Sequence, residues 1–332
     1  MKRFLCLLLA LALLPAPLAS AQEKLPVIGV CIYNMEDTFM ASMQSAITRL
    51  AQGVAELVSY DSQNNQNTQN NQVDELLAQN VDALIVNPVD RTASIYLQQM
   101  AMQRDIPIVF INREPLKEDL AQYGKAYYVG IDPKQQGRLS GSMAADYFLN
   151  VSGADRNGDG KMQLVLFKGE PGHQDAELRT IYTLEALREK GIEVQLLSEE
   201  IALWQRTLGQ ERMAALLNVY GDNIECVISN NDDMALGAID ALKAAGYFSG
   251  AKYMPVFGID ATAPAMEALR QGSLYATVYN NANSQGSAAL SLAMLLAAGE
   301  EVNEQTFDYA INDKVVYIDS IAFTSDVLSE RK

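Results

Sequence analysis

The sequence predicts an α/β protein built from two doubly wound parallel-sheet lobes. Short, continuous apolar runs alternate along the chain with segments of helical periodicity, a pattern typical of parallel strands that helices cover on both faces. About ten such runs occur in 332 residues, which is too many for one comfortable sheet in this length. A turn rich in Asp, Asn and Gly near Asp155 divides two similar halves, so we expect two lobes.

The predicted strands are short runs rich in Val, Ile and Leu. In the first half they are PVIGVCIY, ELVSY, ALIVNP and PIVFIN, and in the second half QLVLFKG, EVQLL, CVISN, PVFGID and ATVYN. We predict helices between them. The polar run over residues 62–72, SQNNQNTQNNQ, lies between a predicted strand and a predicted helix, so we interpret it as a loop plus the first helical turns and not as a disordered tract.

Residues 1–21 have the features of a cleavable signal peptide. Lys2 and Arg3 precede an apolar run over residues 4–14, and the small residues ASA at 19–21 form a cleavage site. The apolar run is too short to anchor the chain in a bilayer. We therefore expect an exported, soluble protein.

The charge balance excludes some classes of partner. The chain has 25 Lys and Arg against 41 Asp and Glu, a formal net charge of −16 at pH 7. It therefore lacks the basic surface of a nucleic-acid-binding protein, and anionic membranes would repel it. Beyond the expected leader the cysteines are Cys31 and Cys226, both in apolar runs. Two buried free thiols are the favoured interpretation, and a disulfide is the alternative.

The segment DRNGDGKMQ has the spacing of an EF-hand-type calcium loop. Its sixth residue is Gly, and its seventh, Lys161, needs to contribute only a backbone carbonyl. The side chains with oxygen at positions 1, 3, 5 and 9 are Asp155, Asn157, Asp159 and Gln163. Position 12, where an EF-hand places a bidentate Glu, is Leu166, and a strand over residues 164–168 is expected there. Two interpretations stay open, a calcium site completed by another segment or a plain Asx turn.

The adjoining segment GEPGHQDAELR leaves that strand and opens a helix. Asp175 and Arg179 stand four residues apart, so their side chains share one helix face. His173, the only histidine of the chain, lies just ahead of them. A carboxylate, a guanidinium and an imidazole gathered where a strand feeds a helix predict a polar ligand clamp. The alternative is a surface ion pair beside a solvated histidine.

Other polar residues follow the predicted strands, at the edge of the sheet where such folds bind ligands. These strand-end residues are Asp37, Asn87, Asn112, Arg113, Asn231, Asp260 and Asn280. Each has a structural alternative as a helix cap or a turn residue. Together they favour a ligand with many hydroxyl groups, because Asp accepts, Asn donates and accepts, and Arg donates in pairs. Phe39 and Trp204 are candidates for stacking on the apolar face of a sugar ring, with a core position as the alternative for Trp204.

Eight segments together carry a resemblance to a known family. They are YNMEDTFM, YDSQNNQNTQNNQVD, PIVFINREP, KAYYVGID, residues 154–179, IECVISNNDDMALGA, PVFGID and TVYNNAN. With them the chain resembles the galactose- and glucose-binding proteins of the type I periplasmic binding protein family, which serve bacterial ABC transporters. The resemblance extends from about Val27 to near Asp319.

The resemblance implies a fold in which the chain crosses between two lobes three times. The implied crossings lie near residues 130–132, 279–282 and 318–321. The N-terminal lobe would comprise residues 22–130 and 282–317, and the C-terminal lobe residues 133–278 and 322–332. The family's members are periplasmic receptors. We therefore expect a monomeric periplasmic receptor and not an enzyme. It would deliver D-galactose or D-glucose to the membrane permease of an ABC importer, with a chemoreceptor as a further partner.

The resemblance also implies specific ligand contacts. The implied sugar-binding residues are Asp37, Phe39, Asn112, His173, Asp175, Arg179, Trp204, Asn231, Asp260 and Asn280. Phe39 and Trp204 would sandwich the sugar ring. The implied ligands of a structural Ca²⁺ are Asp155, Asn157, Asp159, the Lys161 carbonyl, Gln163 and Glu225. In this interpretation the remote Glu225 supplies the carboxylate missing at position 12.

Three other functions remain as alternatives. The first is a binding protein for xylose, arabinose or ribose in place of a hexose. A glycosidase would use two carboxylates among Asp37, Asp175 and Asp260. A sugar-sensing repressor shares the lobe architecture, but it needs an N-terminal helix-turn-helix where this chain has the expected signal peptide.

Overall fold

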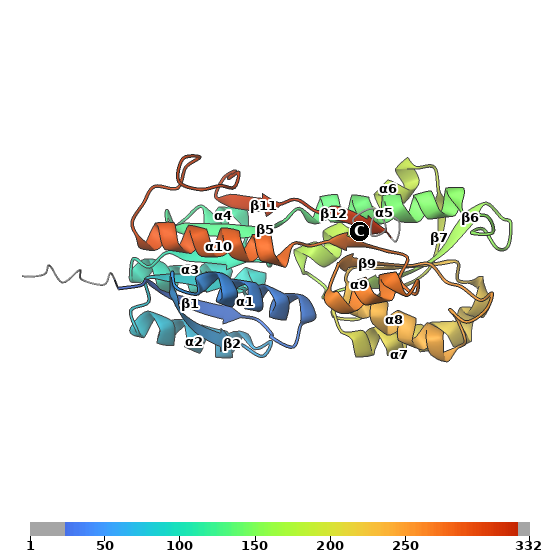
Figure 1. The fold of residues 1–332 in the computed structure, drawn as a ribbon, viewed down its shortest axis with the longest axis horizontal. Helices are drawn as coiled ribbons and strands as arrows, with labels where there is room; N and C mark the ends of the chain where they lie inside the picture. The colour runs from blue at the N-terminus through green and yellow to red at the C-terminus, as the bar shows by residue number, and fades with distance from the viewer. Residues whose placement is uncertain (1–23, 325–332) are drawn as a thin grey trace, which may run out of the picture.

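The computed structural model describes residues 24–324. The signal peptide predicted at residues 1–21 lies outside this range, as do residues 325–332 of the predicted C-terminal lobe. The described chain forms an elongated molecule of two α/β lobes arranged end to end (Figure 1). Each lobe contains one six-stranded sheet, and the predicted fold class is confirmed. Within residues 24–324 no helix has the length and apolar character needed to span a membrane.

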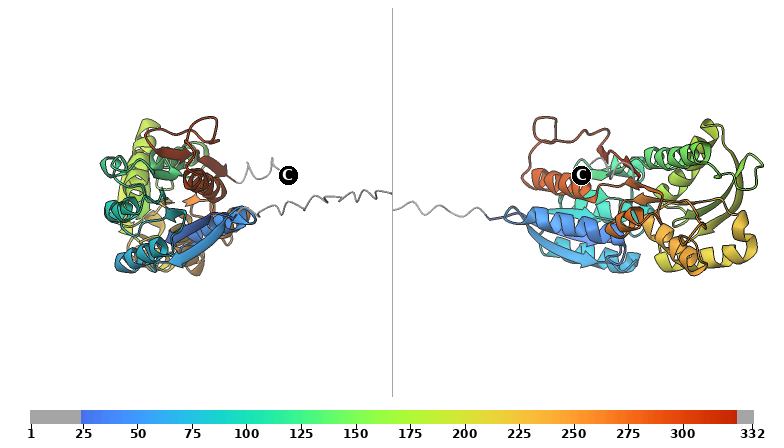
Figure 2. Two further views of the ribbon diagram at one scale, coloured as in Figure 1. Left: turned by 90° about the vertical axis from the view of Figure 1, so that its left-hand side faces the viewer. Right: turned by 45° about the vertical axis from the view of Figure 1, so that its right-hand side comes forward.

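The first lobe contains a parallel sheet in the strand order β11-β5-β4-β3-β1-β2. Its strands are β1 (Val27–Ile32), β2 (Glu56–Asp61), β3 (Ala83–Val86), β4 (Ile108–Ile111), β5 (Ala126–Ile131) and β11 (Val315–Ile318). The helices of this lobe are α1 (Thr38–Ala51), α2 (Gln66–Ala78), η1 (Arg91–Ala93), α3 (Ser94–Gln103), α4 (Lys117–Leu120) and α10 (Ala282–Ala297). Apolar residues of α1 and α10 pack on one face of the sheet, and those of α2 and α3 on the other. Figure 2 shows this layering from two further sides.

The second lobe repeats the arrangement in the order β12-β10-β9-β8-β6-β7. Its strands are β6 (Lys161–Lys168), β7 (Glu193–Ile201), β8 (Cys226–Ser229), β9 (Val256–Asp260), β10 (Ala276–Tyr279) and β12 (Ile321–Thr324). Its helices are α5 (Pro133–Asn150), α6 (Gln174–Glu189), α7 (Arg206–Tyr220), η2 (Gly221–Asn223), α8 (Asp232–Ala244) and α9 (Ala263–Arg270). Apolar residues of α7, α8 and α9 form one core and those of α5 another, on opposite faces of the sheet. All strand pairs are parallel except β10 with β12.

The chain passes between the lobes at three short connections. They join β5 to α5, β10 to α10, and β11 to β12. In the last, only two residues separate a strand of the first sheet from a strand of the second. All three run side by side between the lobes (Figure 1).

Helix α6 is held unusually close to α5 by glycine. A Cβ on Gly137 would lie 2.7 Å from the Arg179 carbonyl oxygen, and one on Gly141 would lie 2.4 Å from that of Thr183. Any side chain at these two positions would therefore push the helices apart. The two glycines thus set the position of α6 and of Arg179.

Two sequence expectations are settled by the fold. Strand β6 begins at Lys161 and not at residue 164, because its first residues pair with β7 from Lys161 opposite Glu193 onward. Cys31 lies in β1 of the first sheet and Cys226 in β8 of the second. Both are buried free thiols, so the interpretation favoured over a disulfide is confirmed.

Candidate functional site

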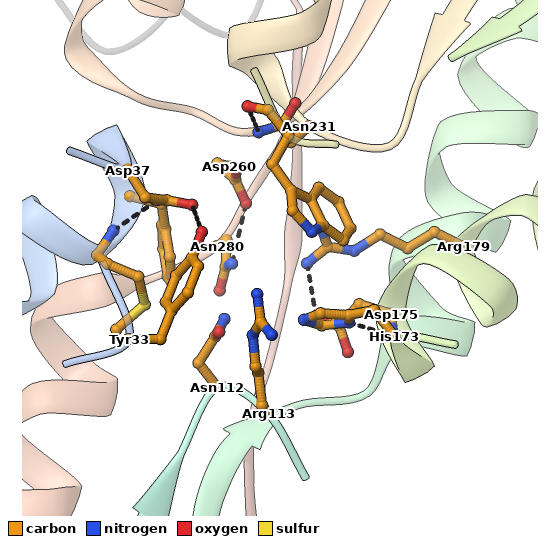
Figure 3. Close-up of a pocket in the computed structure, with 13 residues that line it drawn as sticks. Tyr33, Asp37, Asn112, Arg113, His173, Asp175, Arg179, Asn231, Asp260 and Asn280 are labelled. Atoms are coloured by element: carbon orange, nitrogen blue, oxygen red, sulfur yellow. Dashed lines mark hydrogen bonds and ion pairs between the residues drawn. The ribbon is translucent and has the colours of Figure 1, made fainter. Parts of the chain in front are cut away.

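A small polar cavity lies between the lobes, at the carboxyl ends of the strands (Figure 3). The lining residues are Tyr33, Asp37, Phe39, Met40, Asn112, Arg113, His173, Asp175, Arg179, Trp204, Asn231, Asp260 and Asn280. The structure therefore brings all ten residues named as sugar contacts to one cavity, with contributions from both lobes.

On the side of the first lobe, Asp37 has two functions at once. Its Oδ1 accepts a hydrogen bond from the Met40 amide at 2.9 Å and caps α1, as the structural alternative had it. Its Oδ2 accepts from the Tyr33 hydroxyl at 2.6 Å. Burial, with the neighbouring Asp37 charge, raises the pKa of Tyr33 well above its usual value, so the phenol stays a donor. A carboxylate held from two sides in this way is a fixed acceptor for a ligand hydroxyl.

Asn112 follows β4 in a left-handed conformation, with φ of 61°. Its side-chain oxygen accepts from the Asn87 amide at 3.3 Å, and its backbone carbonyl accepts from the Tyr128 hydroxyl at 2.9 Å. Asn87 is fully buried and lies behind the cavity, so this strand-end residue supports the site and does not line it. Figure 3 shows the Asn112 side chain pointing into the cavity.

His173 is the N-cap of α6 and is held as a neutral ring. Its Nδ1 accepts a hydrogen bond from the Asp175 amide at 3.1 Å, which assigns the proton of the neutral ring to Nε2. Burial lowers its pKa well below the usual value, and the charges of Arg113 and Arg179 add to this effect. His173 therefore presents an N–H donor, not a cation, over the physiological pH range.

Arg179 is the best-connected side chain of the site. Its Nε donates to Gln136 at 2.8 Å and its Nη1 to the Asn230 carbonyl at 2.8 Å. Its Nη2 lies 3.1 Å from Asp175 Oδ2, and both side chains are almost fully buried. Burial raises the pKa of Asp175 to about 6, although the Arg179 charge opposes this shift. The surface ion pair offered as an alternative is therefore wrong, since both partners are in the interior.

Asp260 and Asn280 form a polar chain that reaches from the second lobe into the first. The Asn280 amide donates to Asp260 Oδ1 at 3.0 Å, and the Gln285 amide of α10 donates to Asn280 at 2.6 Å. Burial raises the pKa of Asp260 well above its usual value, which Arg179 opposes and the buried Asp232 reinforces. Asp232 is itself held by hydrogen bonds from Thr262 and Thr277 at 2.8 Å.

The two aromatic candidates lie on the cavity wall. Trp204 has a φ of 67°, and its ring lies edge-on to His173 at 5.0 Å between centroids. A Cβ on Gly169 would lie 2.2 Å from this ring, so glycine is needed there to seat the indole. Trp204 is partly buried and packs at the edge of the apolar core, and it also lines the cavity, so its stacking on a sugar ring stays a prediction. Asn231 caps α8 and also donates to the Trp204 carbonyl at 3.3 Å.

Three lining residues were not named as contacts from the sequence: Tyr33, Met40 and Arg113. Tyr33 ends an apolar run and Met40 belongs to an apolar helix stripe, so neither has a polar signal of its own. Arg113 does have such a signal, because it follows a predicted strand directly. Its guanidinium lies over the Tyr33 ring, 4.1 Å from the ring centroid, and its side chain is 4% exposed.

The loop before β6 has the donor set of a hard-cation site. Glu225 is buried, and its carboxylate accepts from the backbone amides of Arg156 at 2.6 Å and of Gln163 at 3.3 Å. Gln163 Oε1 is buried without a hydrogen-bond partner, which leaves an acceptor available. Asx-type hydrogen bonds hold the loop, for instance from the Gly158 amide to Asp155 at 2.7 Å and from the Lys161 amide to Asp159 at 2.8 Å. In the described chain no three His, Cys, Asp or Glu side chains converge as a metal cluster, so the amide and carbonyl oxygens would be essential ligands.

Comparison with known families gives one match over most of the chain. The model of the periplasmic binding protein domain matches residues 28–301. The D-galactose/methyl-galactoside binding periplasmic protein MglB of Haemophilus influenzae is 40% identical over 306 residues, which cover 91% of each chain. The ribose import binding protein RbsB of Escherichia coli is 27% identical, with 95% of this chain and 98% of that protein covered.

Solved structures show the same fold. An ABC transporter solute-binding protein from Bacillus halodurans with bound myo-inositol is 30% identical, with a TM-score of 0.78 over 94% of this chain and 99% of that chain. A periplasmic solute-binding protein from Actinobacillus succinogenes with bound D-allose has a TM-score of 0.79 at 23% identity, over 92% of this chain and 99% of that chain. Both chains are therefore similar to this one over nearly their full length.

Proposed function

The chain belongs to the periplasmic binding protein family, and from this premise we propose that it is a receptor for a single hexose, D-galactose or D-glucose. The observation that carries the proposal is the cavity between the lobes, lined by fixed acceptors and donors from both sides. Asp37 and Asp260 accept, whereas His173 and Arg179 donate. A neutral ring with hydroxyl groups all around its edge matches such a lining without bringing any charge.

The aromatic side chains support a pyranose in this position. Phe39 comes from the first lobe and Trp204 from the second, and both line the cavity. The apolar C–H faces of a sugar ring would pack between them while its hydroxyl groups point outward to the polar residues.

The names of the relatives support the same class of ligand. One relative is a D-galactose/methyl-galactoside binding protein, and a similar solved structure contains myo-inositol, another six-membered ring polyol. The alternative is a different monosaccharide, and the ribose import binding proteins make ribose the first to test.

We propose that the three connections between the lobes act as a hinge. Ligand contacts that come from both lobes are complete only when the lobes are together, so a bound sugar would favour the closed form. The receptor would be a periplasmic monomer that delivers its sugar to the permease of an ABC importer. A chemoreceptor that recognises the closed form is a further expected partner.

We propose binding without turnover. The site surrounds one small molecule, and its carboxylates are engaged in capping α1, pairing with Arg179 and holding Asn280. Incubation with aryl galactosides and aryl glucosides should release no phenol. Any steady release that saturates with substrate would revive the glycosidase alternative.

We also propose a structural Ca²⁺ in the loop before β6. The residues that would hold it are Asp155, Asn157, Asp159, the Lys161 carbonyl, Gln163 and Glu225. The spare Gln163 oxygen supports this assignment, since a buried acceptor without a partner is costly. The ion would draw together the carboxylates of Asp155, Asp159 and Glu225, which do not converge as a cluster in the described chain. It would tie the loop to the strand that begins at Cys226, and it would have no part in sugar recognition.

Calorimetric titration of the mature protein with D-galactose, D-glucose, D-ribose, L-arabinose, D-xylose and myo-inositol tests the main proposal. We expect saturable binding of one molecule of galactose or glucose and much weaker binding of the pentoses. Asp260→Asn should abolish most of the affinity, because it replaces an acceptor by a partial donor, whereas the exposed Asp308→Asn should not change it. Tighter binding of a pentose than of either hexose would favour the alternative, and no heat with any sugar would overturn the proposal.

A further inference from the structure

One ion pair connects the two lobes. Arg113 follows β4 in the first lobe, and its Nη2 lies 2.9 Å from Oε2 of Glu170, which follows β6 in the second lobe. The other ion pairs within residues 24–324 join residues of the same lobe. Opening the lobes would therefore break this one ion pair and no other in the described chain.

The Arg113 side chain is fixed to its own lobe before it reaches across. Its Nη1 donates to the Val89 carbonyl, and its guanidinium carbon lies over the Tyr33 ring, 4.1 Å from the ring centroid. Only Nη2 extends to the second lobe, where it meets a carboxylate whose side chain is 39% exposed. An arginine fixed in place loses little further conformational freedom when the pair forms, which makes such a contact more favourable than an ordinary surface pair.

The same pair is connected to the ligand cavity. Tyr33, on which Arg113 stacks, donates its hydroxyl hydrogen to Asp37, a proposed sugar acceptor. Arg113 itself lines the cavity, and its Nε is buried without a hydrogen-bond partner. Glu170 does not line the cavity. The contacts thus run from the acceptor Asp37 through Tyr33 and Arg113 to Glu170 on the opposite lobe.

A second contact lies next to the first. Glu114, the residue after Arg113, is 5% exposed and accepts from Gln174 of the second lobe at 2.6 Å. It also accepts from the Tyr317 hydroxyl of β11 at 2.8 Å, so it too is fixed within its own lobe. Two consecutive residues of the first lobe therefore contact the second lobe beside the ligand cavity.

We infer that Arg113 and Glu170 form a latch that holds the lobes closed and thereby sets the affinity for sugar without Glu170 touching the sugar. The inference rests on the proposed function for its ligand but not for the latch itself. The apparent affinity of a receptor is reduced by the fraction of molecules that are not in the binding-competent form, here the closed form. Weakening the latch therefore raises the apparent Kd and speeds dissociation. Because the sugar is neutral, any dependence of its affinity on salt would arise within the protein, and screening of this pair is the expected source.

The test compares Glu170→Gln and Glu170→Ala with the wild type in calorimetry against D-galactose and D-glucose at low and high NaCl. We expect the Kd of both variants to rise roughly three- to tenfold at low salt, more for Ala, and to depend less on salt than that of the wild type. The matched control is Glu185→Gln, which breaks an arginine pair within the second lobe only. A double-mutant cycle with Arg113→Gln, which removes the charge, separates the pair from any direct contact of Arg113 with sugar.

Small-angle scattering of the protein without sugar tests the latch independently of the proposed function. If the wild type binds no sugar, the proposed function fails, and the latch still predicts that Glu170→Ala has a larger radius of gyration than the wild type at low salt. Kd values within twofold of the wild type, unchanged salt dependence and superimposable scattering curves would together overturn the latch. A coupling of zero in the cycle would overturn it as well.

Discussion

The Asp175 carboxylate and the Arg179 guanidinium lie 3.1 Å apart, one turn from each other on α6, in the interior of the molecule. Burial is nevertheless the larger influence on the carboxyl group, and it raises the pKa of Asp175 from 3.8 to about 6. The pair is thus not a simple stabilising contact: with its pKa raised, this carboxyl costs stability once it is ionised. Its presence at the cavity indicates a function in binding.

The first prediction concerns the pH dependence of stability. The pKa of Asp175 is higher in the folded state than in the unfolded state, so the folded protein holds the Asp175 proton more tightly. The stability that this proton gives to the folded state is present at low pH and is lost as pH rises through about 6. The unfolding free energy of Asp175→Asn minus that of the wild type should therefore increase by on the order of 2–3 kcal/mol when the pH is raised from 4 to 7. Urea titrations at both pH values measure this difference. Asp308→Asn, an exposed control, should show no such trend, and a gap between Asp175→Asn and the wild type that does not change with pH would contradict the assignment.

The second prediction concerns Trp204. As the single tryptophan of the chain, it should report sugar binding through a change in intrinsic fluorescence. Trp204→Ala should raise the Kd tenfold or more, because stacking adds about 0.5–1.5 kcal/mol beyond the apolar area buried. Gly169→Ala should also raise the Kd, since the added methyl group would occupy space now taken by the indole ring. Tyr96→Ala, at a half-exposed ring on α3, is the control; a Kd unaffected by Trp204→Ala would leave the indole a purely structural role.

The third prediction concerns calcium. EGTA should lower the melting temperature while leaving sugar binding at 25 °C nearly unchanged, because no proposed metal ligand lines the cavity. A cation that binds only the native state stabilises it by RT ln(1 + [L]/Kd), about 2.7 kcal/mol at a hundredfold excess over Kd. Glu225→Gln should reproduce most of the loss, and added calcium should not restore it. Exposed Glu211→Gln should behave as the wild type. Identical melting curves with and without calcium would leave the loop as an Asx turn.

The fourth prediction concerns the two thiols. Burial raises the pKa of Cys31 to about 12 and that of Cys226 even further, so neither forms an appreciable amount of thiolate at neutral pH. The native protein should therefore react very slowly with Ellman's reagent at pH 8, and both thiols should react at once in guanidinium chloride. Rapid reaction of the native protein, or no free thiol after unfolding, would contradict the structure.

Much of the fold could be predicted from local patterns. Runs such as ALIV and CVIS are buried along their whole length, so their continuous apolar sequence predicts a strand without information from the rest of the chain. The polar strand ends are similarly local, because a residue after a parallel strand lies at the carboxyl edge of the sheet by necessity. This is why Asp37, Asn112, His173 and Asp260, far apart in sequence, could be named together before any coordinates.

The sequence by itself thus determined most of the strands and which polar residues reach the strand ends, although its apolar runs included none of β5, β11 and β12. The tertiary structure alone decided three further points. It placed β11 and β12, two short strands only two residues apart, in different sheets. It brought Tyr33 into the cavity wall against Arg113, and it set Glu170 against Arg113 across the lobes. The physical reason is that strand and helix propensities act over a few neighbouring residues, whereas these contacts join residues as much as 80 positions apart. They depend on how two finished lobes meet, and no local pattern contains that information.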